Sequence, residues 1–348
     1  MTYSTRVLHS VNECESAWWN ELGKGTGFTS WRWYQYGETV LANSQPLYIV
    51  VEKDARPVAR ATFWVKRVDA LPIASNLLYH GMNAVFNRWP LLSCQSPLAN
   101  ASGLLLPDGS EREEIFGLLM GRANAAAQEI GASFLVLDFI SAQQAKQLNH
   151  SGKLSGVDMN EPGTILEIIW PDFDAYLQSR SKSVSKDYRR AGNKVKRMGV
   201  EIRVEARVTD IAAAAALIQR HDKTYKSPTL PWLEEMLRHI DLVDSIWLGA
   251  YAGEKLVGCG LLLGDNDTWV ATALGRDYDY PYVYFALGYA SIRNVIERGG
   301  KYLRLGTGTY DFKKRLGCEL EANDHVAFMA QNKLVDTFFR KIAARLVG

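Results

Sequence analysis

Apolar and polar residues alternate along two segments in a way that predicts β-hairpins. Residues 48–65 read as an apolar strand, a polar turn at 53–57 and a second strand, and residues 246–263 repeat this order around a turn at 252–255. A period of two is typical of strands, and a short polar turn joins antiparallel neighbours. We therefore expect two related hairpins, one in each half of the chain.

A second pair of landmarks follows the hairpins in the same order. Residues 127–131 end a helical pattern at a glycine and lead into the apolar strand 134–137, as residues 295–299 lead into 302–305. Two matched landmarks in one order indicate a duplicated αβ module. The first copy is longer, and we place its extra residues between 66 and 103, as either a substrate-wall loop or an inert insertion.

The chain length and a polar stretch at 141–163 favour two domains. At 348 residues the chain exceeds the size of one ordinary domain, which is about 100–200 residues. We therefore expect an α/β fold of two tandem modules, each a mixed sheet flanked by helices, at residues 1–160 and 161–348.

The second module shows the clearer periodicity, and its last part carries the candidate chemistry. Residues 281–318 predict a helix, a strand and a basic loop bounded by glycines. Before this segment we expect a basic helix at 176–198, a helix at 209–226, a helix at 230–240 and a strand at 268–273.

Composition and charge restrict the possible function classes. Hydrophobic residues make up 47% of the chain and the net charge is +2, so the chain as a whole is no polyanion binder. The four cysteines are far apart, and no metal-binding spacing occurs, so we expect neither disulfides nor a metal. The N-terminus lacks a signal-peptide pattern and no apolar run could span a membrane, which predicts a soluble, cytoplasmic protein.

Local positive charge is concentrated in the basic helix. Residues 179–197 contain eight basic residues and one acid. Apolar residues recur at steps of four and three on one face, so Lys186, Arg189 and Arg190 project from the other. Such a face suits the phosphates of coenzyme A, an acyl carrier or tRNA, although a merely solvated basic helix is an equal alternative.

The order of helix, Glu-Arg-Gly, strand, glycine loop and Y-x-F-K-x-x-x-G at 310–317 resembles the second GNAT-type module of the FemABX and BioF2-like acyltransferases. Members of that family move an acyl or aminoacyl group onto an amine. The resemblance covers about 164–327 and implies tandem GNAT-like modules, with the catalytic cleft in the C-terminal module. It gives Phe312, Lys313 and Gly317 as the matching residues, and Lys313 as the cation that stabilises charge on the reacting carbonyl.

Other candidates lie at the end of strand 268–273 and the start of the next helix. GNAT enzymes bind a pyrophosphate there on a glycine-rich loop, but residues 276–284 have no glycine pattern. We take Asp277 and Tyr284 as catalytic candidates and Tyr282, with the basic helix, as a donor-binding candidate; a capping aspartate and packed tyrosines are the alternative. For His221, in helix 209–226, a buried histidine with its hydrogen bonds satisfied, or an exposed one, is favoured over a base.

Three functions remain open at this point. The first is N-acyl transfer from a thioester, acyl-CoA or acyl carrier protein, to an amine of a small metabolite or peptide. The second is aminoacyl-tRNA-dependent transfer to a peptide or peptidoglycan precursor. The third is a GNAT-fold module that binds a ligand or partner without catalysis.

Overall fold

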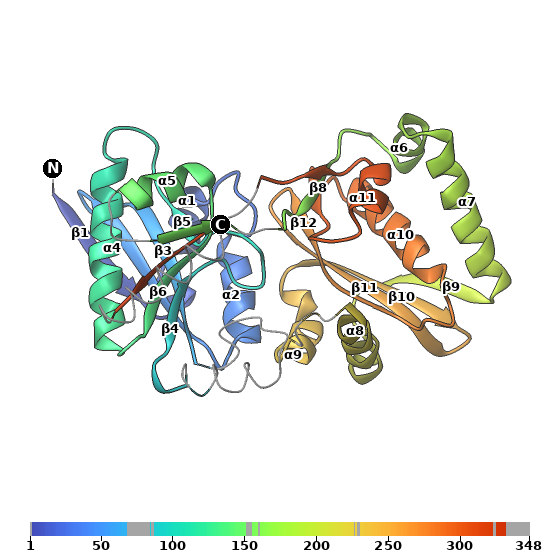
Figure 1. The fold of residues 1–348 in the computed structure, drawn as a ribbon, viewed down its shortest axis with the longest axis horizontal. Coiled ribbons are helices and arrows are strands. Elements are labelled where there is room, and N and C mark those ends of the chain that lie inside the picture. The colour runs from blue at the N-terminus through green and yellow to red at the C-terminus, as the bar shows by residue number, and fades with distance from the viewer. Residues whose placement is uncertain are drawn as a thin grey trace. The chain divides into compact units, whose positions relative to one another are not determined.

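The computed structural model describes residues 2–67, 84, 87–150, 155–158, 161–225, 227, 230–322 and 325–331. The chain forms two compact units, one made by residues 1–160 with the segment from 322 onward and the other by residues 161–321 (Figure 1). Each unit is a mixed β-sheet flanked by helices, which confirms the predicted fold class. None of the helices among the described residues has the length and hydrophobicity of a membrane span.

The first unit is built on an eight-stranded sheet in the described residues. Its main path runs β1 (Tyr3–Leu8), β2 (Gln45–Lys53), β3 (Arg56–Lys66), β4 (Leu91–Cys94), β6 (Phe134–Ile140), β15 (His325–Ala330) and β7 (Ser155–Asp158), and β5 (Leu104–Leu105) pairs with β3. The helices described here are α1 (Ser16–Leu22), α2 (Trp31–Val40), α4 (Arg112–Glu129) and α5 (Ala142–His150). Strands β4 and β6 run parallel, joined through α4.

Strand alternation decides which side chains face which helices in the first unit. Ile49 and Val51 of β2 belong to the core that includes α4 and α5. Tyr48 points to the opposite face, where its ring lies 5.3 Å from that of Trp19 in α1 and 6.2 Å from that of Trp64. Both faces of the sheet are therefore covered, which explains why β2 and β3 are apolar nearly throughout.

The second unit is built on a seven-stranded sheet of described residues. Its order is β14 (Glu319–Leu320), β8 (Thr164–Glu167), β13 (Tyr302–Arg304), β12 (Thr268–Arg276), β11 (Lys255–Asp265), β10 (Asp244–Ala252) and β9 (Val200–Glu205). Its helices are α6 (Phe173–Ser179), α7 (Lys182–Arg197), α8 (Ile211–Tyr225), α9 (Leu233–Arg238), α10 (Val283–Glu297) and α11 (Tyr310–Leu316). Only β12 and β13 are parallel neighbours among these strands.

Helices cover both faces of the second sheet. Helices α6, α7 and α10 lie over one face and share its core, while α8 and α9 lie over the other (Figure 1). Helix α8 approaches β12 closely at Gly275, where an added Cβ would lie 2.7 Å from the backbone nitrogen of Ile218. A glycine at this position lets the helix pack directly on the strand.

The predicted repeat is visible in the two hairpins. Both β2–β3 and β10–β11 are antiparallel, and each has a register shift near its turn, at Val51/Glu52 and at Ala250/Tyr251. Each hairpin is followed by a parallel strand pair joined through a helix, α4 in the first unit and α10 in the second. The duplicated order read from the sequence is therefore confirmed in the structure.

The structure corrects three expectations. The second module does not continue to residue 348, because β15 pairs with β6 and β7 of the first sheet. The proposed insertion at 66–103 includes a sheet strand, β4, whereas residues 68–83 lie outside the described part. The basic helix expected at 176–198 is two helices, because the backbone is extended at Arg180 and Ser181.

Candidate functional site

The second half of β12 forms an open strand edge inside the second sheet. Its first residues, Thr268 to Val270, pair with β13. From Ala271 to Arg276 the strand has a described partner only in β11, with a bulge at Thr272. These residues are mostly half-buried although the strand lies within the sheet. An extended segment of a substrate can therefore pair with the strand here.

Asp277 begins the turn that leads from β12 to α10. Its carboxylate accepts a hydrogen bond from Lys255 Nζ at 3.1 Å and from the amide of Asp279 at 3.3 Å, and Arg220 Nη1 lies 3.6 Å away. Burial by itself would raise the pKa of Asp277, but these partners outweigh it and hold the pKa below its usual value. A carboxylate stabilised in its charged form is a poor proton acceptor, which favours a structural part for Asp277 in this turn.

Lys313 lies on α11, the helix that the sequence predicted as a loop. Gly317 ends this helix in the left-handed conformation, with φ of 94°. The side chain is only 6% exposed, and Nζ donates to the carbonyl oxygens of Gly306 at 3.0 Å and Thr307 at 2.7 Å. Burial lowers the pKa of Lys313 to about 8. An ammonium has three donors, so two fix the loop after β13 and one remains for another acceptor.

Phe312 and Tyr284 bring α11 and α10 together. The ring of Phe312 lies 5.1 Å from that of Phe285 and 5.8 Å from that of Tyr284. The hydroxyl group of Tyr284 is 3.3 Å from Oγ1 of Thr309, the residue that precedes α11. Two of the predicted residues are therefore in contact, and Lys313 follows Phe312 directly in the same helix.

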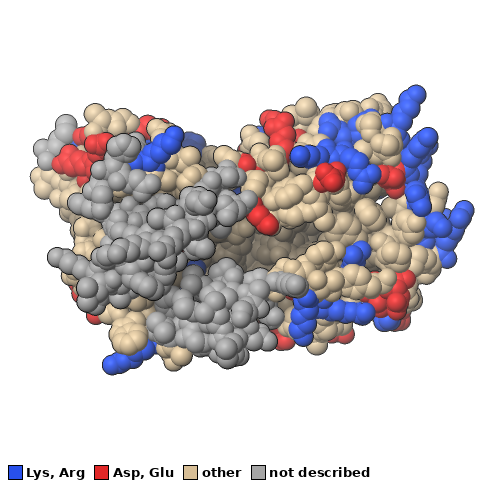
Figure 2. Space-filling model, in the orientation of Figure 1, with Lys and Arg blue, Asp and Glu red and all other residues tan. Residues whose placement is uncertain are grey.

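The basic face of α7 meets the start of α10 at one point. Arg190 Nη2 donates to the hydroxyl of Tyr282 at 3.2 Å, and Lys194 Nζ lies 5.8 Å from the centre of the same ring. Lys186 lies one turn before Arg190, so it shares this face, whereas Arg189 donates to the carbonyl of Ser185 within α7. Figure 2 shows the blue Lys and Arg atoms gathered over α7 at the right edge of the view. The structure thus brings Arg190 and Tyr282 together but leaves Lys186 and Arg189 exposed.

Four further residues gather at the end of β12. Arg276 contacts the rings of Tyr278 and Tyr284 and lies 3.4 Å from the hydroxyl of Tyr225. His221 Nδ1 lies 3.4 Å from the hydroxyl of Tyr278. No local sequence motif marks this cluster, since it joins α8 to a turn more than fifty residues away.

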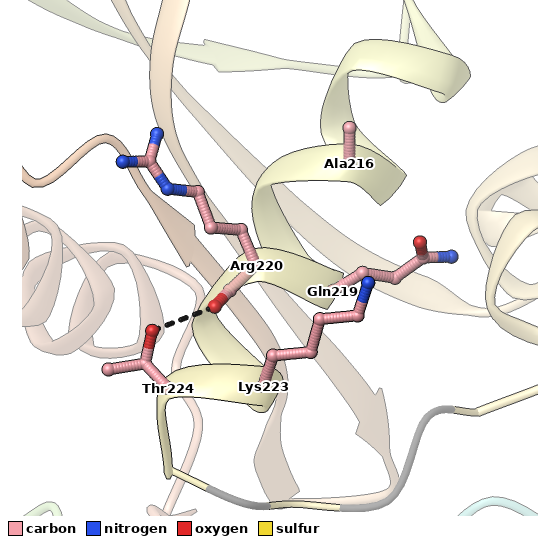
Figure 3. A pocket seen from close by; sticks show the side chains of 5 residues that line it. All are labelled: Ala216, Gln219, Arg220, Lys223 and Thr224. Carbon is pink, nitrogen blue, oxygen red and sulfur yellow. Dashed lines mark hydrogen bonds between the residues drawn. The ribbon is translucent and has the colours of Figure 1, made fainter.

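A basic groove runs along the outer side of α8. The cavity has a volume of about 500 Å³ and is lined by Ala216, Gln219, Arg220, Lys223 and Thr224 (Figure 3). Thr224 Oγ1 donates to the carbonyl oxygen of Arg220 at 2.9 Å, so the end of the helix is internally bonded. Arg220 also faces Asp277, which links this groove to the turn after β12.

Among the described residues, no group of three or more His, Cys, Asp or Glu side chains could hold a metal ion. The groups that the site offers are instead a buried ammonium, a guanidinium between aromatic rings, an imidazole and an open strand edge. These can bind an extended substrate, stabilise an oxyanion and accept a proton.

A family model described as FemAB-like, for peptidoglycan biosynthesis/recognition, matches residues 10–343. The crystal structure of FemX superposes with a TM-score of 0.64 at 11% identity, covering 97% of this chain and 100% of that chain. A tandem GNAT protein from the clavulanic acid biosynthesis pathway gives 0.57 at 12% identity, covering 95% and 99%. These two likenesses concern the fold alone, and no curated protein matches the sequence.

Proposed function

Because the chain belongs to the FemAB-like family, we propose that it transfers an aminoacyl group from an aminoacyl-tRNA to an amine of a peptidoglycan precursor peptide. The observation that carries this proposal is the family match over residues 10–343, on a fold of two GNAT-like modules. A transferase of GNAT type follows from the family; the donor and the acceptor are the proposed part.

The open edge of β12 and the ammonium of Lys313 support transfer at a carbonyl. The donor lies in extended form along Ala271–Arg276, where one side of the strand has no described partner. The amine attacks the ester carbonyl, and negative charge develops on its oxygen. Lys313 is already fixed by Gly306 and Thr307, so its third donor can meet that oxygen without rearrangement.

The turn after β12 argues for tRNA over coenzyme A as the donor. It contains two carboxylates, Asp277 and Asp279, and the amides of Tyr280 and Val283 donate to carbonyls within the turn itself. A pyrophosphate bound here would meet negative charge and few available amides. The exposed basic face of α7, with Arg190 at Tyr282, suits the backbone phosphates of RNA instead.

A thioester donor remains the second candidate, and the same strand edge supports it. The pantetheine arm of coenzyme A or of an acyl carrier protein is a chain of amides, which could pair with Ala271–Arg276 as a peptide does. Under this alternative the acceptor would again be an amine of a small metabolite or peptide, and Lys313 would keep its part.

The test supplies purified protein with radiolabelled aminoacyl-tRNA or radiolabelled acetyl-CoA and a muramyl pentapeptide as acceptor. We expect label in the peptide only with the tRNA donor, and ribonuclease treatment before the reaction abolishes the transfer. Rising salt weakens the tRNA-dependent reaction, because phosphate contacts release counterions. Transfer from acetyl-CoA that resists ribonuclease would establish the thioester candidate.

A matched pair of lysine variants tests the site. Lys313→Ala is expected to reduce kcat by roughly 10²–10³, the usual effect of removing one oxyanion donor. Lys314→Ala, its exposed neighbour on α11, leaves kcat unchanged. Equal activity of the two variants would remove Lys313 from the mechanism. Absence of transfer from either donor, together with tight binding of the peptide, would support a binding module without catalysis.

A further inference from the structure

Arg276 is an unusual cation because its charge faces aromatic rings and no carboxylate among the described residues. The centre of its guanidinium lies 4.5 Å from the ring of Tyr278 and 5.2 Å from that of Tyr284. Its Nη2 reaches only the hydroxyl of Tyr225, at 3.4 Å, and its Nε is buried without a described partner. The guanidinium of this half-buried residue therefore has no counter-charge among the described residues, which suits an anionic ligand group.

Arg276 lies at the end of the open strand edge, so an anionic group bound to it would belong to the substrate. Arg276 is the last residue of β12 and ends the open strand edge. Tyr284, whose ring it contacts, reaches Thr309 at the start of α11. The amides of Phe312 and Lys313 donate to the carbonyl of Thr309, so contacts run from Arg276 to the helix of the buried lysine.

His221 lies on α8 beside this guanidinium. Its Nδ1 is 3.4 Å from the hydroxyl of Tyr278, and its ring lies 4.7 Å from that of Tyr225. Burial lowers the pKa of His221, and the charge of Arg276 lowers it further. Asp222, next to it on α8, has a pKa raised to about 6 by burial. The imidazole is therefore neutral near pH 7, the state in which it accepts a proton.

We propose that Arg276 and His221 form the acceptor subsite for an amine whose own carbon carries a carboxylate. Diaminopimelate has such an amine at the end of its side chain, whereas lysine has the same chain without that carboxylate. The guanidinium of Arg276 binds the carboxylate through two donors, as planar forks do. His221 faces the neighbouring amine. This inference rests on the proposed function, and it specifies the acceptor and the proton acceptor.

The reaction balances with these groups. The amine nitrogen forms a bond to the ester carbonyl carbon, and the bond from that carbon to the ribose oxygen breaks. The amine loses one proton to His221, and the leaving oxygen gains one as the imidazolium returns its proton through solvent. No oxidant, reductant or further reactant is needed.

The test compares muramyl tripeptides that end in diaminopimelate or in lysine, with the tRNA donor. We expect the wild-type protein to prefer the diaminopimelate peptide by at least about tenfold in kcat/KM, the effect of a hydrogen-bonded charge. Arg276→Gln raises KM for that peptide about ten- to hundredfold and removes the preference. Arg276→Lys, which keeps the charge, retains part of it. Arg207→Gln, an exposed arginine of the same module, serves as the control and changes neither.

A pH–rate profile tests whether His221 is the proton acceptor. His221→Gln is expected to lower kcat about a hundredfold and to remove the fall in rate on the acid side, below about pH 6.5. His239→Gln, another half-buried histidine of this module, should leave that limb in place. An unchanged profile in His221→Gln would overturn its assignment as the proton acceptor.

Calorimetry separates this proposal from the proposed function because it needs no donor. The muramyl tripeptides that end in diaminopimelate or in lysine are titrated into wild-type protein and into Arg276→Gln, because within the peptide only diaminopimelate carries a free amine and a carboxylate on one carbon. Tighter binding of the diaminopimelate peptide that is lost in the variant supports the subsite, even if no donor yields transfer. Equal binding of the two peptides to the wild-type protein, or an equal loss of both in the variant, overturns it.

Discussion

Lys313 is buried with its ammonium held by two carbonyl oxygens, and this environment sets its response to pH. Because burial lowers the pKa of Lys313 to about 8, the ammonium is lost as the pH rises through about 8. We expect kcat/KM for the acceptor to fall on this alkaline side. In Lys313→Arg the fall should move to higher pH, since a guanidinium stays charged. A pH–rate profile with the same alkaline limb in both proteins would contradict this assignment.

Asp277 differs from Lys313 because its environment favours the charged form: its partners keep the carboxylate ionised. Asp277→Asn should lower the free energy of unfolding by about 1–3 kcal/mol at pH 7, because the charge that Lys255 and Arg220 face is removed. The loss should shrink as the pH falls below about 4, because the carboxyl of the unfolded chain then binds a proton while that of the folded protein is still ionised. Urea unfolding measures it, with exposed Asp279→Asn as the control. A drop in kcat above tenfold in the folded variant would return Asp277 to the catalytic group.

The sequence marked the residues of this candidate site unequally. Phe312, Lys313 and Tyr284 became candidates because a local motif or a helix start marks them. Arg276 and His221 could not be paired, since α8 brings His221 to β12 only through tertiary packing. A single sequence shows the period of α8 but not which strand it covers, and that contact decides what His221 faces.

Helix α8 can take its position because β12 has a glycine under it. Gly275→Ala would place a Cβ 2.7 Å from the nitrogen of Ile218 and 2.9 Å from Sγ of Cys259. We expect a loss of about 1–3 kcal/mol in unfolding free energy, the usual cost of overpacking. The displaced helix should also weaken acceptor binding, because it carries His221. Gly260→Ala in the neighbouring strand, where a Cβ meets nothing within 4 Å, is the matched control for denaturant unfolding.

The elements with strong periodicity could be predicted from the sequence. Short helices, and strands that pair with a distant part of the chain, could not. The hairpins and α10 follow directly from their patterns. Helix α11 is one short run of seven residues between Thr309 and Gly317, so its sequence resembles a loop. The break between α6 and α7 is set by two extended residues and by Asp172 and Ser181 as separate N-caps. Strand β15 depends on a partner almost two hundred residues away, which no local pattern reports.

The chain leaves the first unit once and returns to it, which makes the second unit an inserted domain. The two ends of the insertion meet, since the amide of Glu321 donates to the carbonyl of Gly163 at 2.9 Å. Strand β15 then lies between β6 and β7, and both neighbours run antiparallel to it. The chain of the first unit is therefore complete only after the second unit has been synthesised.

This order of the chain predicts unequal behaviour of fragments. Residues 161–321 hold the whole second sheet and its core, so the fragment should unfold cooperatively in urea. Residues 1–160 alone lack β15, which leaves β6 without that neighbour and β7 with no partner in the sheet. We expect this fragment to be far less stable and prone to aggregate. Joining residues 322–348 to it through a short glycine-serine linker should restore a cooperative transition, because the ends of the insertion lie side by side. A fragment of residues 1–160 as stable as the linked form would show that β15 adds nothing to the first unit.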